Sequence, residues 1–373
     1  MPTSPIAAGV CIKRGLVAMA DRVGLVIGPT GATGGPIAAT LARRSGWRVY
    51  GMSRTAPSGD APFTHLVADL SDPASCRRAL VAIEPVTHVF FAARAPFREG
   101  GVEDVEGNVA MLAATLDALE PRSEALEHVH LLEGIKWYGM HLGPYPTPSR
   151  EDDSRHLPPN FYYDQQDLLS ARAALARWSW SASRPSYICD FAPQRSRNII
   201  TVLGTYAAIC RELDVPLDFP GTAAGYSVLC ELSDATCLAE AIIFISTHDS
   251  GKNAAFNVTN GDSFRWCQVW PLLAQWFGIR CGVPRRIKLA SWMADKGPVW
   301  DRIVARHGLE PRSLESLASW QFADFCIREG MGPSYRYRPA EARRVHCMCR
   351  YNRHDPRSTR QISRCKPAAA LDA

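Results

Sequence analysis

The stretch that decides the fold is VGLVIGPTGATGG, residues 23–35, in which an apolar strand is joined to a helix through three glycines. Gly28 allows a tight turn after the strand, and Gly31 lets the backbone approach a pyrophosphate closely. Gly34 lets the helix pack against the strand, with its N-terminal N–H groups facing the phosphates. Thr30 lies inside the same turn. The stretch therefore predicts a dinucleotide-binding site at Gly28, Thr30, Gly31 and Gly34.

These glycines could instead do no more than punctuate a turn between a strand and a helix. The residues that follow favour the cofactor site. An amphipathic helix continues through residues 37–42, and the apolar segment WRVYGM, residues 47–52, supplies a second strand. Together they complete one strand–helix–strand unit of the kind that forms parallel sheets.

The rest of the body repeats this alternation of strand and helix. Helices of this length between strands predict a doubly wound parallel sheet, the α/β Rossmann architecture, followed by a smaller and mainly helical substrate lobe. The expected strands lie near Phe63, after Thr87, after His128 and in WSWSASRPSYIC up to Cys189, and the expected helices span residues 73–83 and 108–119.

The composition changes at both ends of the sequence. We expect residues 1–20 to be a disordered leader without the features of a targeting peptide, and residues 330–373 to be a basic, disordered tail without apolar periodicity. Between them we expect a dinucleotide-binding domain over residues 21–195 and a substrate-binding lobe over residues 196–329, interleaved with that domain. A frameshifted or mis-spliced reading frame could also account for the tail.

The formal net charge of +5 is concentrated in this tail. Ten basic and three acidic residues lie between Met331 and Ala373, so that segment carries +7 and the rest of the chain −2. The folded body is close to neutral, and no general attraction to nucleic acid is expected. A zinc site in the tail would need His346, Cys347, Cys349 and His354, whose spacing matches no structural zinc pattern, so we expect no metal.

The bulk composition indicates a globular protein. The 373 residues are 46% hydrophobic and 21% charged, and no apolar run approaches the length of a membrane-spanning helix. The twelve cysteines are scattered and form no CxxC pair. Reduced thiols in a cytoplasmic protein are therefore expected.

Polar residues follow the second and third strands, where ligands of such sheets bind. Ser53 and Arg54 occupy the place where NAD-specific proteins usually carry an acidic residue, so Arg54 favours a 2′-phosphate and NADPH, although NADH could also serve. Arg54 could also be an ordinary surface arginine. Asp69 and Leu70 could frame the adenine, or Asp69 could belong to the N-cap region before Pro73.

The catalytic residues depart from the usual tyrosine–lysine order. Short-chain dehydrogenases place a lysine one helical turn after the tyrosine, but here Gln166 stands four residues after Tyr162. A lysine occurs upstream instead, in EGIKWYG, where Lys136 directly follows the expected fifth strand. That position places Lys136 near the nicotinamide end of the cofactor.

The segments GIKWYGMHLGPY and NFYYDQQDLL resemble the G-x-K-H-Y-x-G-P-F and N-F-Y-Y-x-x-E-D motifs of the progesterone 5β-reductase and iridoid synthase-like enone reductases. In this atypical group of short-chain dehydrogenases the lysine precedes the tyrosine. The resemblance extends over about residues 23–323. It implies NADPH-dependent reduction of the C=C bond of a small hydrophobic α,β-unsaturated carbonyl compound, in natural-product metabolism, by a protein that could form a homodimer.

The resemblance also implies site residues. The family's catalytic lysine and tyrosine fall on Lys136 and Tyr162, its adenine and 2′-phosphate contacts on Arg54 and Asp69, and its nicotinamide-facing Pro-x-x-Ile on Pro185 and Ile188. In the implied mechanism hydride is added to the β-carbon while the Tyr162 hydroxyl binds the carbonyl oxygen. Tyr162 could otherwise be a core tyrosine beside Phe161 and Tyr163.

Several positions depart from the family pattern, and these departures imply a substrate other than a steroid. Three of them lie on the expected substrate pocket: Arg94 follows Ala93 in place of a Thr-Trp pair, Trp137 replaces a histidine, and Tyr145 replaces a phenylalanine. The other departures are Thr55, Leu132, Glu133 and Asp190. In the family the segment after residue 323 closes the pocket, and the basic tail here would leave that lid incomplete.

Other functions fit the same residues. A carbonyl reductase or an epimerase could use this scaffold, and so could an NADPH-binding protein without catalytic activity, because fold alone does not determine chemistry.

Overall fold

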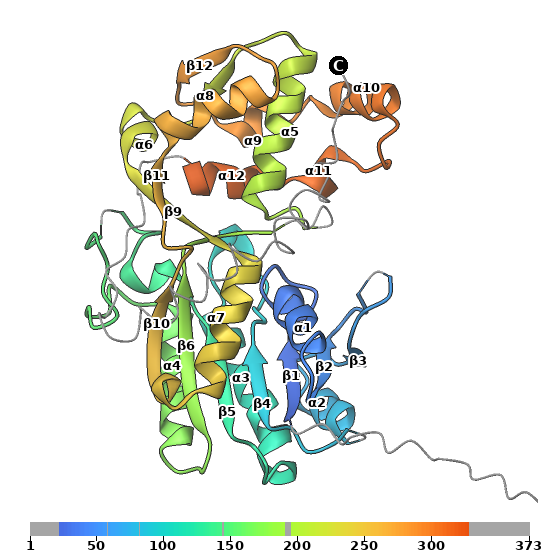
Figure 1. Cartoon of the computed structure of the whole chain (residues 1–373), viewed down its shortest axis with the longest axis vertical. Helices are drawn as coiled ribbons and strands as arrows, with labels where there is room; N and C mark the ends of the chain where they lie inside the picture. Colours follow the sequence, from blue (N-terminus) through green and yellow to red (C-terminus); the bar gives the residue numbers. More distant parts are fainter. Residues whose placement is uncertain (1–21, 58, 82, 144, 191–194, 328–373) are drawn as a thin grey trace, which may run out of the picture.

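The computed structural model describes residues 22–57, 59–81, 83–143, 145–190 and 195–327 of the chain. The leader predicted at 1–20 and the tail predicted at 330–373 lie outside the described residues. The described part contains a parallel α/β layer and a mainly helical lobe, which lie at opposite ends of the molecule in Figure 1.

A seven-stranded sheet, in the order β10-β6-β5-β4-β1-β2-β3, forms the centre of the first part. All of its strand pairs are parallel, which confirms the predicted doubly wound Rossmann sheet. Because helices cover both faces, central strands such as β1 are almost entirely apolar and buried. The strands are β1 Arg22–Ile27, β2 Trp47–Ser53, β3 Thr64–Val67, β4 His88–Phe91, β5 His128–Leu132, β6 Ser179–Pro185 and β10 Ala254–Val258.

Two apolar cores cover the two faces of this sheet. On one face α1 Gly34–Ala42 and α7 Ala235–Thr247 pack against each other and against Val26 and Phe90. On the other face the apolar sides of three helices cover Leu25. These are α2 Pro73–Leu80, α3 Val105–Leu119 and α4 Phe161–Ala173. Since α7 and β10 come late in the chain, the two parts of the protein are interleaved in sequence.

The second lobe has its own apolar core, in which Trp270 and Phe219 are fully buried. Its small sheets have the orders β11-β9-β7 and β12-β8. Its strands are β7 Tyr187–Cys189, β8 Leu217–Phe219, β9 Leu229–Asp234, β11 Ser263–Arg265 and β12 Cys281–Pro284. Its helices are α5 Ile199–Glu212, α6 Ala223–Ser227, α8 Trp266–Trp276, α9 Leu289–Trp292, α10 Gly297–His307, α11 Leu314–Leu317 and α12 Trp320–Ile327.

One predicted strand is divided between the two parts. The sequence indicates a single strand up to Cys189, but β6 ends at Pro185 and β7 pairs with β9 of the second lobe. Ser186 causes the switch, because its backbone N–H donates to Ser233 Oγ (3.1 Å) and its hydroxyl donates to the Glu231 carbonyl (2.7 Å). Hydrogen bonds of this kind carry no periodic signal that sequence patterning could detect.

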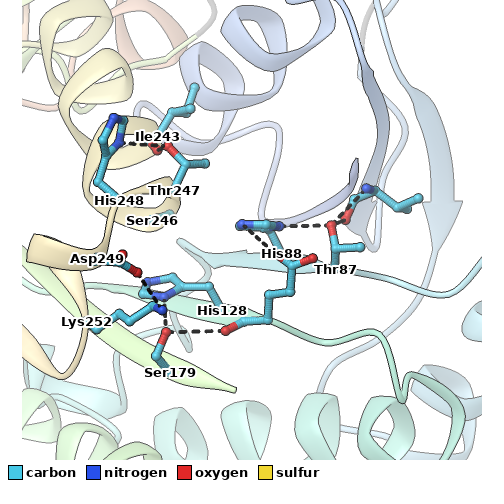
Figure 2. A network of polar contacts seen from close by, with 12 residues as sticks. Thr87, His88, His128, Ser179, Ile243, Ser246, Thr247, His248, Asp249 and Lys252 are labelled. Atoms are coloured by element: carbon cyan, nitrogen blue, oxygen red, sulfur yellow. Dashed lines mark hydrogen bonds and ion pairs between the residues drawn. The ribbon is translucent and has the colours of Figure 1, made fainter. Parts of the chain in front are cut away.

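A buried polar network crosses the sheet toward the amino ends of β4, β5 and β6. His88 contacts Thr87 Oγ1 (2.9 Å), and His128 contacts Ser179 Oγ (2.8 Å), as Figure 2 shows. His130, two residues along β5, lies between the hydroxyls of Ser181 and Ser183. These contacts satisfy imidazoles that would otherwise be costly to bury.

Burial keeps these imidazoles neutral. It lowers the pKa of His88 to about 4, of His128 to about 2 and of His130 to about 3. In the unfolded chain a histidine titrates near pH 6.5. Below that pH the unfolded chain binds protons that the folded protein does not, so acid favours unfolding.

We therefore predict that the free energy of unfolding falls between pH 7 and pH 5, by about 2 kcal/mol for each of the three histidines. Urea unfolding at the two pH values measures this loss. A His130→Gln variant should lose about 2 kcal/mol less than the wild type over the same interval. Equal losses in the two proteins would contradict the assignment.

Candidate active site

The glycine turn after β1 forms a cradle. Gly28 has φ +82°, and a Cβ there would lie 3.1 Å from backbone atoms of Ala93, at the end of β4. A Cβ on Gly34 would overlap the Gly28 carbonyl oxygen, so α1 can begin directly against the turn only because both residues are glycines. The N-terminus of α1 is therefore accessible to an anionic group at the carboxyl edge of the sheet, a geometry that fits a pyrophosphate.

Arg195 lies over this cradle, and the sequence analysis did not identify it. Its Nε donates to the Thr30 carbonyl (3.0 Å), its guanidinium is ion-paired with Asp190, and its Nη2 lies where a Cβ of Gly35 would be. A cation at the N-terminus of α1 would add to the attraction of the cradle for phosphate. Arg195 lies between β7 and α5, where no sequence pattern distinguishes it from a surface arginine.

The predicted adenine-end residues lie together at the ends of β2 and β3. The Ser53 hydroxyl contacts His65 Nε2 (2.9 Å), and the Ser53 carbonyl accepts a hydrogen bond from Ala68 (3.2 Å). Arg54 is exposed, and among the described residues its guanidinium makes no hydrogen bond or ion pair. It is thus available to an incoming 2′-phosphate.

Asp69 closes the neighbouring turn, next to the buried Leu70. Its carboxylate accepts hydrogen bonds from the hydroxyl and the backbone N–H of Ser71 (2.7 and 2.9 Å), and these bonds lower its pKa, with a smaller contribution from the charge of Arg54. The N-cap of α2 is Asp72, whose backbone N–H donates to the Asp69 carbonyl (3.1 Å), so Asp69 lies in the turn that leads into this helix.

Lys136 and Tyr162 belong to two elements that hydrogen bonds hold together. Lys136 lies in a 3-10 turn, η3 Ile135–Tyr138, after β5, and Tyr162 lies in the first turn of α4. The N-cap of α4, Asn160, accepts from the Tyr162 backbone N–H (3.1 Å) and donates to the Lys136 carbonyl (2.9 Å). Tyr163 Oη donates to the Trp137 carbonyl (2.6 Å). The turn and the helix therefore form one unit.

The phenol of Tyr162 lies at the carboxyl ends of β5 and β6. A Cβ on Gly134 would lie 3.3 Å from Tyr162 Oη and 3.7 Å from the Pro185 carbonyl oxygen. Burial, and then the charge of Glu103, raise the pKa of Tyr162 well above its usual value. The phenol is therefore protonated and can donate a hydrogen bond. Ile188, in β7, is half-buried against the core beneath α1 and α7.

Glu103 is a second residue that sequence reasoning missed. Its Oε1 binds Lys136 Nζ (2.5 Å) and Arg94 Nη2 (3.3 Å), so one carboxylate neutralises part of the charge of two cations. Burial lowers the pKa of Lys136, whereas Glu103 opposes that shift. The acid stands just before α3 in an ordinary loop position and carried no recognisable signal.

The three predicted pocket residues lie in different surroundings. Arg94 is exposed and, together with Glu103, forms the mouth of the site. Its Cζ lies 3.8 Å from the centre of the Phe97 ring. Trp137 is buried on the Tyr163 side of α4, with the two rings 4.8 Å apart, and contributes to the support of the site. Tyr145 packs in the aromatic cluster that also includes Tyr162, and its hydroxyl finds no hydrogen-bond partner among the described residues.

A buried ion pair supports this cluster from below. Arg184 Nε binds Glu133 Oε2 (2.8 Å), and the guanidinium stacks 3.6 Å above the Trp137 ring. Arg184 also donates to Gln166 Oε1 (3.1 Å) in α4. Burial raises the pKa of Glu133 to about 7, and the charge of Arg184 partly offsets this shift. Glu133 therefore anchors the ends of β5 and β6.

The described residues include no cluster of side chains suited to a metal ion. In the same part of the chain no helix has the length and apolar character needed to cross a membrane.

Known proteins are similar to this chain in sequence. A family model described as a PRISE-like Rossmann-fold domain matches residues 67–329. An (S)-8-oxocitronellyl enol synthase of Camptotheca acuminata is 36% identical over 340 residues, which cover 84% of this chain and 86% of that enzyme. The 3-oxo-Delta(4,5)-steroid 5-beta-reductase of Arabidopsis thaliana is 34% identical over 334 residues, which cover 83% of this chain and 84% of that protein.

Solved structures with the same fold are more distant in sequence. The NAD complex of UDP-glucose 4-epimerase from Thermus thermophilus has a TM-score of 0.54 and 19% identity, covering 71% of this chain and 87% of that one. The Thermotoga maritima UDP-glucose 4-epimerase with UDP-glucose has a TM-score of 0.55 and 16% identity, covering 71% and 86%. These likenesses show the fold alone.

The unpartnered guanidinium of Arg54 generates a test of cofactor choice. An Arg54→Ala variant should bind NADPH about tenfold more weakly, because it loses a charge-assisted hydrogen bond to the 2′-phosphate. Its affinity for NADH, which lacks that phosphate, should stay within about twofold of the wild type. Fluorescence titration with each cofactor measures both values, and Arg77→Ala, on the nearby α2 surface, is the matched control. A parallel loss of NADPH and NADH affinity would contradict the assignment.

Proposed function

Because this chain belongs to the PRISE-like family of Rossmann-fold proteins, we propose that it reduces the C=C bond of small α,β-unsaturated carbonyl compounds with NADPH. It is an oxidoreductase of the short-chain dehydrogenase/reductase superfamily. The observation that carries the proposal is the protonated phenol of Tyr162, positioned by Asn160 beside the turn that bears Lys136.

The cofactor is held at three points in this proposal. The cradle of Gly28 and Gly34 receives the pyrophosphate, with Arg195 above it, and Arg54 receives the 2′-phosphate. Pro185 and the ends of β5 and β6 would hold the nicotinamide. Bound NADPH supplies a hydride at this edge.

The residues of the chain stabilise the charge that the reaction creates. Hydride addition to the β-carbon turns the carbonyl oxygen into an enolate oxygen, so a donor aimed at that oxygen binds the transition state better than the substrate. Tyr162 is this donor, and its high pKa keeps the proton on the phenol. Lys136 adds positive charge nearby, and Glu103 limits the net charge of the site before substrate binds.

The substrate class follows from the relatives. The two relatives named above are an enol synthase and a steroid 5-beta-reductase, and we propose a small carbonyl compound of natural-product metabolism for this chain. All cysteines in the described part carry free thiols, which supports a reducing compartment such as the cytoplasm. Homodimer formation stays a prediction.

We expect the purified protein to oxidise NADPH with cyclohexenone or progesterone, releasing the saturated ketone. A Tyr162→Phe variant should lose about 10²- to 10³-fold in kcat, the usual effect of removing one oxyanion donor. The loss should fall on kcat, with the Kd for NADPH unchanged. Absorbance of the reduced nicotinamide follows turnover, and chromatography identifies the product.

A matched control removes a tyrosine hydroxyl elsewhere. Tyr226, which packs against Phe219 in the second lobe, can be changed to phenylalanine, and this variant should keep wild-type activity. No turnover by the wild type across a panel of enones would reject the proposed function. Equal activities of the Tyr162→Phe variant and the wild type would reject the role of that phenol.

A further inference from the structure

The mouth of the site carries more positive than negative charge. Three cations gather there, Arg94, Lys136 and Arg197, and one carboxylate, Glu103, binds two of them. Arg197 comes from the loop that leads into α5. Within the described residues its guanidinium has no hydrogen-bond or ion-pair partner. In the described part of the chain Arg197 is therefore a guanidinium without an ion-pair partner, and Glu103 acts on it only through its charge.

Arg197 and Arg94 converge on one aromatic ring. Arg94 Cζ lies 3.8 Å and Arg197 Cζ 5.4 Å from the centre of the Phe97 ring. Two like charges on one ring repel each other, and burial together with Arg94 lowers the pKa of Arg197. The ring offsets part of this repulsion by cation–π contact, but it provides no negative charge. An anion bound by both guanidinium groups would offset the repulsion between them.

The same cations surround the catalytic pair. Arg94 and Arg197 both act electrostatically on Tyr162 and on Lys136. Helix α12 covers this side of the site. Phe325 lies 5.7 Å from Lys136 Nζ, and the Ser319 N–H binds the Ser196 carbonyl (2.8 Å) beside Arg197. The charges of both arginines therefore lie near the phenol that would bind the substrate carbonyl.

We propose that the substrate carries a carboxylate that Arg94 and Arg197 bind, so that this enzyme reduces unsaturated oxo acids. The inference rests on the proposed function. A carboxylate fits because guanidinium groups bind it through paired charge-assisted hydrogen bonds. In the reaction a hydride from NADPH and a proton from solvent add across the C=C bond, and the carboxylate itself is unchanged.

A cofactor phosphate is the other anion that could reach these arginines. The cofactor's pyrophosphate belongs at the glycine cradle, where Arg195 already lies against Thr30. Arg197 instead lies near the Phe97 and Phe322 rings, with its Cζ 5.4 and 5.2 Å from their centres. These contacts favour the substrate as the source of the anion, and the experiment has to separate the two sources.

The test compares linear 2-enals that end in a carboxylate, in several chain lengths, with their methyl esters. At the best length we expect kcat/KM for the acid to exceed that for the ester by about tenfold or more, mainly through a lower KM. An Arg197→Gln variant should bring this ratio to about one, and Arg197→Lys should restore part of it. Arg286→Gln, an exposed arginine of the second lobe, should keep the wild-type ratio.

The possible results distinguish a failure of the carboxylate-binding inference from a failure of the proposed function. Turnover of acids and esters at equal kcat/KM by the wild type would overturn this inference and leave the proposed function standing. An Arg197→Gln variant that loses NADPH affinity, and loses acid and ester turnover equally, would assign the guanidinium to the cofactor and also overturn it. Turnover of neither substrate series would reject the proposed function itself.

Discussion

The site depends on the hydrogen bonds of one side chain, Asn160. By capping α4 and donating to the carbonyl of Lys136, it fixes the distance between a turn after β5 and the first turn of a helix that begins more than twenty residues later. Tyr163 adds a second bond between the same two elements. Lys136, which precedes Tyr162 in the chain, therefore lies in a turn that is bound directly to the first turn of the tyrosine's helix.

Charge compensation is the second constraint. Arg184 and Glu133 pair beneath the site and need each other, because either charge alone would be costly to bury. At the mouth the compensation is incomplete among the residues that the structure describes, since Glu103 pairs with Lys136 and Arg94 and no carboxylate pairs with Arg197. This difference separates charges that hold the fold together from charges that face a ligand.

The sequence predicted those features that local chemistry determines. The alternation of strands and helices predicted the parallel sheet. Gly28 marked the turn after β1, because only glycine fits so close to Ala93. The motif around Lys136 predicted, by resemblance, that Lys136 and Tyr162 act together, and hydrogen bonds of Asn160 join the two elements that carry them. Glu103 and Arg195 could not be found in this way, because their partners lie in other elements and a charged loop residue carries no period. The division between β6 and β7 was missed because hydrogen bonds of Ser186, which no pattern reveals, turn the chain.

The central claim is that Lys136 and Tyr162 together direct a hydride to the β-carbon of an enone. Nuclear magnetic resonance of the product formed with NADPH deuterated at C4 of the nicotinamide, using each C4 epimer in turn, tests it most directly. We expect a saturated carbonyl compound with deuterium on the former β-carbon, from one epimer only. Deuterium on the former carbonyl carbon, in an allylic alcohol, would contradict it.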